Sequence, residues 1–394
     1  MKLARQVYAL SIIPIISVLL ALLFGAILII LTSPVSQGQF DLLLPIKAYE
    51  ALLEGATGIS FLNTDDGALA FGLSIDPDRA ARALTSTLVA AGPLVLTGLA
   101  VGVGFKAGLF NIGGTGQVLV GGFFAALAGA AVAEQPVPVA VTIAVVAGAF
   151  GGALYGFIPG VLKAFTGAHE VVVTIMLNSL AAFVIIGLVN DIFKITGPTF
   201  ARTADVGNAA LPVLFGRDGN VGIFIAFAMV PIAYFLIYRT TLGFEIRTVG
   251  ANPSAARYAG MSPRRLIILT LSMCGLFAGL AGAIIILGPS LGYYPAVFGT
   301  TIGFAGITVA LLGRSHPAGI ALAALLLGGM NAGAPAMQIE ADIQREIIDV
   351  IQGLILLFLA MEVVIRRLLR VRAESIAPEE LQTVSASYGQ GSTT

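Results

Sequence analysis

Long apolar runs separated by short polar stretches dominate the chain. A helix that crosses a bilayer needs roughly 20 mostly apolar residues. The eighth run is shorter than most of the others, which favours a tilted, broken or re-entrant segment. The pattern therefore predicts an all-α protein, a polytopic transmembrane helical bundle of about ten spans. The predicted spans are 9–31, 85–105, 109–131, 138–162, 170–190, 221–238, 266–288, 298–313, 317–337 and 347–365.

Basic residues fall mainly on alternate connections between these runs. Placing the N-terminus in the cytoplasm puts 14 of the 21 Lys and Arg residues on the cytoplasmic side. Cytoplasmic loops carry the excess of Lys and Arg in membrane proteins. The sequence therefore predicts that both termini are cytoplasmic, that 33–84 and 191–220 are external loops, and that 239–265 is a large cytoplasmic loop. Residues 373–394 lack an apolar period and are expected to form a disordered cytoplasmic tail.

Composition agrees with a membrane protein. Hydrophobic residues make up 57% and charged residues 11% of the chain, and the mean hydropathy is +0.97. A soluble domain is about a quarter charged. The formal net charge is zero, so charge gives no indication of nucleic-acid binding. The single cysteine, Cys274, lies in an apolar run, where it is expected to act as a small buried hydrophobe.

Small residues repeat at helical spacing in two of the predicted spans. Gly148, Gly152, Gly156 and Gly160 recur every four positions and form one glycine ridge. Gly275 and Gly279 repeat the spacing in a later span. Close backbone approach at small residues is a main source of helix packing in lipid. We expect packing within the chain, with a contact between two subunits as the alternative.

Several kinds of active site have no motif here. The sequence lacks a G-x-x-x-x-G-K-[ST] phosphate-binding loop, an H-E-x-x-H zinc motif and a G-x-S-x-G nucleophile elbow. The predicted spans hold almost no ionisable residues, whereas ion-coupled carriers commonly place Asp, Glu or His there. The sequence therefore predicts a protein that binds no cofactor of its own and takes its coupling energy from elsewhere.

The cytoplasmic loop 239–265 contains a helix-start signal. Asn252 is a suitable N-cap and Pro253 suits the first turn. We expect a short helix through Tyr258, closed by Gly260 in a left-handed turn. Such a capped helix suits docking into a partner, and the small Ala255 and Ala256 are expected to allow close approach to a partner groove. An ordinary amphipathic connector would give the same pattern.

Four ordered stretches carry a family resemblance. The loop reads R-x-x-G-x-N-x-x-A-A-x-Y-A-G-M over 247–261, and the others are GLFNIGGTGQ at 108–117, EVVVTIMLN at 170–178 and GFAGITVALLGRSHP at 303–317. This set resembles the branched-chain amino acid/sugar/nucleoside family of ABC importer permeases, most closely its nucleoside branch. Thr115 and His169 depart from that branch, which often has Glu and Asn there, so the substrate stays open.

The resemblance covers about residues 85–365 and implies a permease of the bacterial plasma membrane. Together with the apolar pattern, it predicts a transmembrane permease domain over 1–372. It also implies a separate ABC ATPase subunit that uses ATP, a second homologous permease subunit, an extracytoplasmic substrate-binding lipoprotein and contact with membrane lipid. The loop is then the ATPase-coupling loop. Its expected coupling residues are Arg247, Gly250, Asn252, Ala255, Ala256, Tyr258 and Gly260.

Polar residues inside the predicted spans are the candidates for the translocation path. Polar groups at that depth are costly unless they are paired or face water. Capping and hydrogen bonds between helices are the structural alternative for all of them. A secondary carrier or channel working without an ATPase is the alternative function. The candidate path residues are Asn111, Gln117, Glu170, Thr174 and Asn178, the last three on one helix face.

Overall fold

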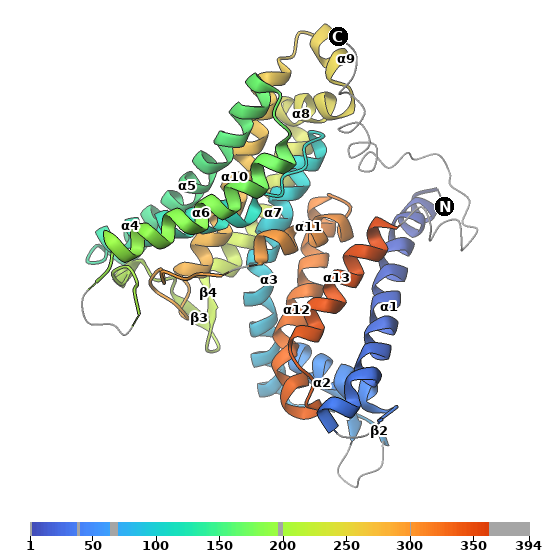
Figure 1. The fold of residues 1–394 in the computed structure, drawn as a ribbon. Coiled ribbons are helices and arrows are strands. Elements are labelled where there is room, and N and C mark those ends of the chain that lie inside the picture. Colours follow the sequence, from blue (N-terminus) through green and yellow to red (C-terminus); the bar gives the residue numbers. More distant parts are fainter. Residues whose placement is uncertain (1, 38–39, 64–69, 196–199, 300, 362–394) are drawn as a thin grey trace. The chain divides into compact units, whose positions relative to one another are not determined.

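The computed structural model describes residues 2–37, 40–63, 70–195, 200–299 and 301–361 (Figure 1). The predicted tail at 373–394 lies outside the described residues. The chain divides into two compact units. Among the described residues, unit 1 comprises those within 2–91, 215–219 and 325–361, and unit 2 comprises the others. Helices α3 (Pro77–Lys106) and α12 (Pro317–Ala341) contribute to both units.

Unit 1 contains α1 (Lys2–Gln37), α2 (Leu44–Thr57), α13 (Glu346–Ala360) and a hairpin of β1 (Ile59–Asn63) and β2 (Ala70–Ile75). The long helices α1 and α13 lie side by side, where the rings of Phe24 and Phe358 are 5.4 Å apart. The hydroxyl of Tyr49 on α2 donates to the Leu22 carbonyl of α1 at 2.6 Å. The segment predicted as an external loop at 33–84 therefore contains helix α2 and the β1–β2 hairpin.

Unit 2 is built around α4 (Gly114–Ala131), α5 (Val137–Thr166) and α10 (Pro263–Ile286), which pack against one another (Figure 1). The other elements are α6 (Glu170–Asp191), the 3-10 turn η1 (Gly207–Ala209), α7 (Val221–Arg239), α8 (Thr241–Ala251), α9 (Pro253–Tyr258) and α11 (Ile302–Leu312). Strands β3 (Val213–Phe215) and β4 (Gly219–Asn220) contain residues of both units. The strands are short, so the prediction of an all-α architecture is confirmed.

The glycine ridge of α5 lies against the glycines of α10. A Cβ atom added to Gly152 would lie 2.2 Å from the Gly275 carbonyl oxygen, and one added to Gly279 would lie 2.5 Å from the Gly148 carbonyl oxygen. No side chain fits at either position without moving a backbone. The ridge therefore packs within the chain, as expected. Cys274, beside Gly275, is fully buried.

The number of full-length spans differs from the prediction. Within the described residues, eight helices are long and apolar enough to cross a membrane. The predicted span at 298–313 contains only α11, whose 11 residues cover about 16 Å, roughly half of the hydrocarbon thickness. The predicted span at 347–365 corresponds to α13, which has 15 residues and ends at Ala360.

A partly irregular segment nevertheless carries the chain across unit 2. After α10, the Leu287 carbonyl accepts from Leu211 N at the end of the unit where α7 begins. After α11, the His316 ring lies 5.6 Å from the ring of Tyr238, at the opposite end of α7. Residues 287–299 contain no helix. The chain therefore passes from one end of unit 2 to the other between α10 and α12. It does so through irregular chain followed by a short helix, so the apolar pattern predicted a full-length helical span where the structure has only α11.

Candidate translocation and coupling sites

The start of α4 is held by two buried amides. Asn111 Nδ2 donates to Gln117 Oε1 at 2.9 Å, and Asn111 Oδ1 accepts from Gly113 N at 3.0 Å. Both side chains are 1% exposed. Buried amides are stable only when they are hydrogen-bonded, and these two largely satisfy each other. Their paired state here favours the hydrogen-bonding alternative over direct exposure to a path.

Asn178 of α6 ties that helix to the same place. Its Oδ1 accepts from Gly116 N at 2.8 Å, and its Nδ2 donates to the Ile112 carbonyl at 3.0 Å. Thr174, one turn earlier and fully buried, lies so close to Gly113 that a Cβ atom there would be 3.0 Å from the threonine Cβ. The predicted face of α6 thus packs against the chain that leads into α4, and it holds that backbone in position.

Glu170, the third member of that face, forms an ion pair with Lys163. The glutamate begins α6 and is 2% exposed, while the lysine lies in the last turn of α5. A carboxylate at a helix start also complements the helix dipole. The pair therefore fixes the turn between α5 and α6.

The start of α11 meets the start of α4. A Cβ atom on Gly303 would lie 2.2 Å from Thr115 N, and one on Gly114 would lie 2.9 Å from the Gly303 carbonyl oxygen. Both helices follow non-helical chain. Two helix N-termini, each with a partial positive charge, therefore come together. Gly303 was not among the residues named from the sequence, although it lies in one of the four family-like stretches.

The coupling loop forms two helices, α8 and α9. Asn252 caps α9, since its Oδ1 accepts from Ser254 N and Ala255 N, each at 3.0 Å. Gly260 has a φ of 81°, the left-handed conformation that was expected to end this helix. The predicted helix cap at Asn252, the helix start at Pro253 and the left-handed turn at Gly260 are confirmed. Helix α8 was missed, although Thr240 caps it by accepting from Gly243 N.

Helices α8 and α9 are fixed on the chain's own core. Ala256 is fully buried in a cluster with Ile246, Leu266 and other apolar residues. A Cβ atom on Gly250 would lie 2.3 Å from the Lys106 carbonyl oxygen, so α8 touches the end of α3. The expectation that Ala256 approaches a partner groove is therefore wrong, because its methyl group faces its own chain.

The outer surface of the coupling loop carries exposed side chains, unlike its buried inner face. Ala255 is exposed. Tyr258 is 96% exposed, so this large aromatic side chain packs against almost nothing in its own chain. Arg247 lies on the inner side, with its guanidinium carbon 5.3 Å from the centre of the Tyr238 ring. The loop thus presents Tyr258 outward while Arg247 contacts α7.

Comparison with known proteins supports the family resemblance that the four sequence stretches indicated. Residues 83–360 match the family described as branched-chain amino acid transport system / permease component. The chain is 40% identical over 281 residues to the guanosine ABC transporter permease protein of Bacillus subtilis, covering 70% of this chain and 80% of the relative. It is 36% identical over 310 residues to the nucleoside ABC transporter permease protein of Lactococcus lactis, covering 76% and 85%.

A third relative is described as a permease for a different class of compound. The glucose ABC transporter permease protein of Haloferax volcanii is 33% identical over 324 residues, which cover 78% of this chain and 84% of the relative. No solved structure matches the chain. The family match spans most of the sequence and the apolar helices fit it. The chain belongs to the branched-chain amino acid transport system permease family, as a multi-pass ABC transporter component of the cell membrane that is not itself an ATPase.

Proposed function

We propose that this chain forms the translocation path of an ATP-driven importer for nucleosides or related sugars. A separate ATPase subunit supplies the energy, and a second homologous permease and an extracytoplasmic binding lipoprotein complete the assembly. The guanosine and nucleoside permeases among the relatives support nucleosides as the substrate class. The glucose permease supports including sugars.

The observation that carries this proposal is the construction of the coupling loop. Helix α9 has a side-chain cap and a buried inner face, so it is a rigid element. Its exposed Tyr258 suits insertion into a partner, since aromatic anchors dominate binding energy at interfaces. Gly250 and Lys106 transmit any movement of the loop to α3, because their backbones are in contact.

The meeting point of α4 and α11 supports a path at that position. Discontinuous helices whose N-termini converge commonly form substrate sites in transporters. Here Asn178 holds one of the two starts through hydrogen bonds to Ile112 and Gly116. Movement of α6 would therefore change the position of the α4 start directly.

Tyr258→Ala tests the coupling role in the full chain expressed with its ATPase. We expect binding of the ATPase to weaken by about tenfold or more, as for an aromatic anchor, and substrate uptake to fall with it. Membrane abundance should not change, because Tyr258 is 96% exposed. Phe150→Ala is the matched control, an exposed aromatic on α5 (61%). Normal ATPase binding by Tyr258→Ala would show that the loop is only a connector.

The substrate class requires its own measurement. Uptake of labelled guanosine by the assembled transporter should exceed uptake of labelled glucose, and excess unlabelled guanosine should compete. Uptake of glucose alone would reject nucleosides while leaving the importer mechanism intact. Uptake that continues without ATP and without an ATPase would instead support a secondary carrier.

A further inference from the structure

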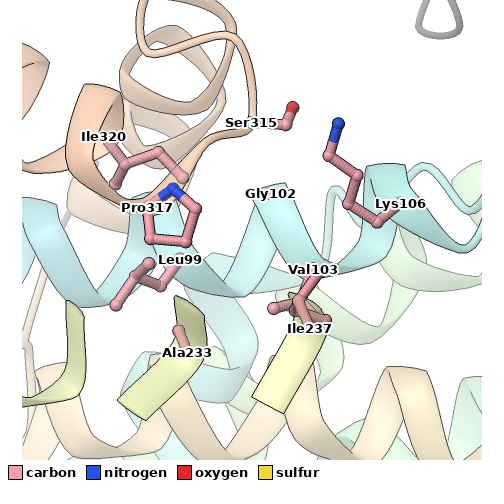
Figure 2. A pocket seen from close by; sticks show the side chains of 9 residues that line it. All are labelled: Leu99, Gly102, Val103, Lys106, Ala233, Ile237, Ser315, Pro317 and Ile320. Atoms are coloured by element: carbon pink, nitrogen blue, oxygen red, sulfur yellow. The ribbon is translucent and has the colours of Figure 1, made fainter. Parts of the chain in front are cut away.

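A small pocket opens beside the Lys106 end of α3, within unit 2 (Figure 2). The empty space at the pocket is about 210 Å³, a volume that includes open solvent. Apolar side chains of α3, α7 and α12 form its walls, and Lys106 and Ser315 also line it. The wall residues include Leu99, Val103, Ala233, Ile237 and Ile320.

Two polar groups at this pocket have no partner in the described part of the chain. No carboxylate there forms an ion pair with Lys106. Ser315 is 3% exposed, and its Oγ has no hydrogen-bond partner. Burying a hydroxyl without a partner is unfavourable, so such a group points to a ligand.

The turn before α12 holds Ser315 in this position. Arg314 and Ser315 both have φ values of 51°, a left-handed conformation that non-glycine residues seldom adopt. Backbone strain of this kind accumulates where a site has to be positioned. Helix α12 begins two residues later, at Pro317, and its N-terminal turn adds a partial positive charge. An ammonium group, a free hydroxyl donor and a helix N-terminus therefore face one small space.

The surroundings select the kind of anion. The walls are apolar, and the pocket lies at the ends of three helices that are long enough to span a membrane, α3, α7 and α12. The ends of helices that cross a bilayer lie at the level of the lipid phosphates, and basic pockets between transmembrane helices bind anionic headgroups. We propose that the pocket binds the phosphate of an anionic phospholipid, with Lys106 and Ser315 contacting the phosphate and the apolar walls contacting the adjacent glycerol and acyl carbons.

Neighbouring charge is compatible with this role. Burial and the positive charge of Lys106 lower the pKa of His316, which follows Ser315. The imidazole is therefore neutral at physiological pH and does not compete with Lys106 for the phosphate.

Native mass spectrometry of the purified full chain tests the proposal. Phosphatidylglycerol would be titrated against wild type, Lys106→Gln, Lys106→Arg and Ser315→Ala, with phosphatidylcholine in parallel. We expect Lys106→Gln to bind phosphatidylglycerol about fivefold more weakly, the factor for one lysine at a membrane surface. Ser315→Ala should lose less and Lys106→Arg should retain binding. Lys194→Gln, which removes an exposed lysine elsewhere, is the matched control.

Three results would overturn the proposal. Equal phosphatidylglycerol binding by wild type, Lys106→Gln and Lys194→Gln would remove the role of the pocket. Displacement of the lipid by equimolar inorganic phosphate would identify a free-anion site instead. Unchanged lipid binding together with lost ATPase binding in Lys106→Gln would assign the lysine to a carboxylate of the partner. Lipid binding is measured without transport, so failure of this proposal is separate from failure of the importer proposal.

Discussion

Asn178 is the polar residue whose removal should matter most at the start of α4. Asn178→Leu removes both of its hydrogen bonds, to Gly116 N and to the Ile112 carbonyl. Leaving those backbone groups unpaired costs about 1–3 kcal/mol each. We expect uptake to fall by at least tenfold, with Asn178→Asp intermediate because its carboxylate can still accept from Gly116 N. Ser179→Leu changes the exposed neighbouring position and should transport normally. Equal uptake by both leucine variants would contradict this role.

His316 gives the protein a pH dependence with a definite sign. Burial first, and Lys106 second, lower its pKa below the usual 6.5 in the folded protein. Besides Lys106, the neighbouring groups are Arg314 in the turn and Tyr234 and Tyr238 of α7. The unfolded chain therefore binds the proton more readily, so stability should fall as the pH drops through 6.5 toward the folded pKa. The melting temperature of wild type should fall more over this interval than that of His316→Gln; parallel curves would contradict the assignment.

At the scale of elements, the contact between α5 and α10 should tolerate no added atoms. A Cβ atom on Gly275 would lie 2.2 Å from the Gly152 carbonyl oxygen. Overpacking of this kind costs about 1–3 kcal/mol or more. We expect Gly275→Ala to lower the melting temperature and the membrane abundance. Gly187→Ala, in α6 with nothing within 4 Å of the added atom, should change neither. Similar losses in both variants would show that the ridge is not a special contact.

Local signals predicted the elements that depend on neighbouring residues. Asn252, Pro253 and Gly260 gave α9 and its ends, because a cap and a left-handed turn act within a few residues. The Thr240 cap could have given α8 in the same way. The predicted spans stop at 288 and resume at 298, so a non-helical connection was expected between them. Local signals could not show that this connection carries part of the crossing.

The candidate site was predictable only in part. Helical periodicity shows which residues share one face of a helix, but it does not show which other segment that face contacts. The spacing of Glu170, Thr174 and Asn178 placed them on one face of α6, but Asn178 bonds to residues 62 and 66 positions away. The same limitation explains Ala256. Its small size suggested approach to another protein, whereas the fold uses that size to bury α9 against its own core.

At the scale of the whole molecule, the distribution of charge predicts which ends of the helices are cytoplasmic. The coupling loop must face the ATPase, so Ser254 should be inside and Asp205, in the loop before α7, should be outside. The irregular crossing between α10 and α12 keeps this alternation without ten full helices. It places Ala318, at the start of α12, on the same side as Ser254.

Cysteine labelling of intact cells tests this arrangement in a Cys274→Ser background, where the buried native thiol is also removed. Asp205, Ser254 and Ala318 are all exposed, so accessibility depends only on the side of the membrane. An impermeant reagent should label a cysteine at Asp205 in intact cells, and those at Ser254 and Ala318 only after permeabilisation. Exchange of the Asp205 and Ser254 results would reverse the orientation. Labelling of Ala318 from outside, with Ser254 protected, would instead show that the segment between α10 and α12 does not cross.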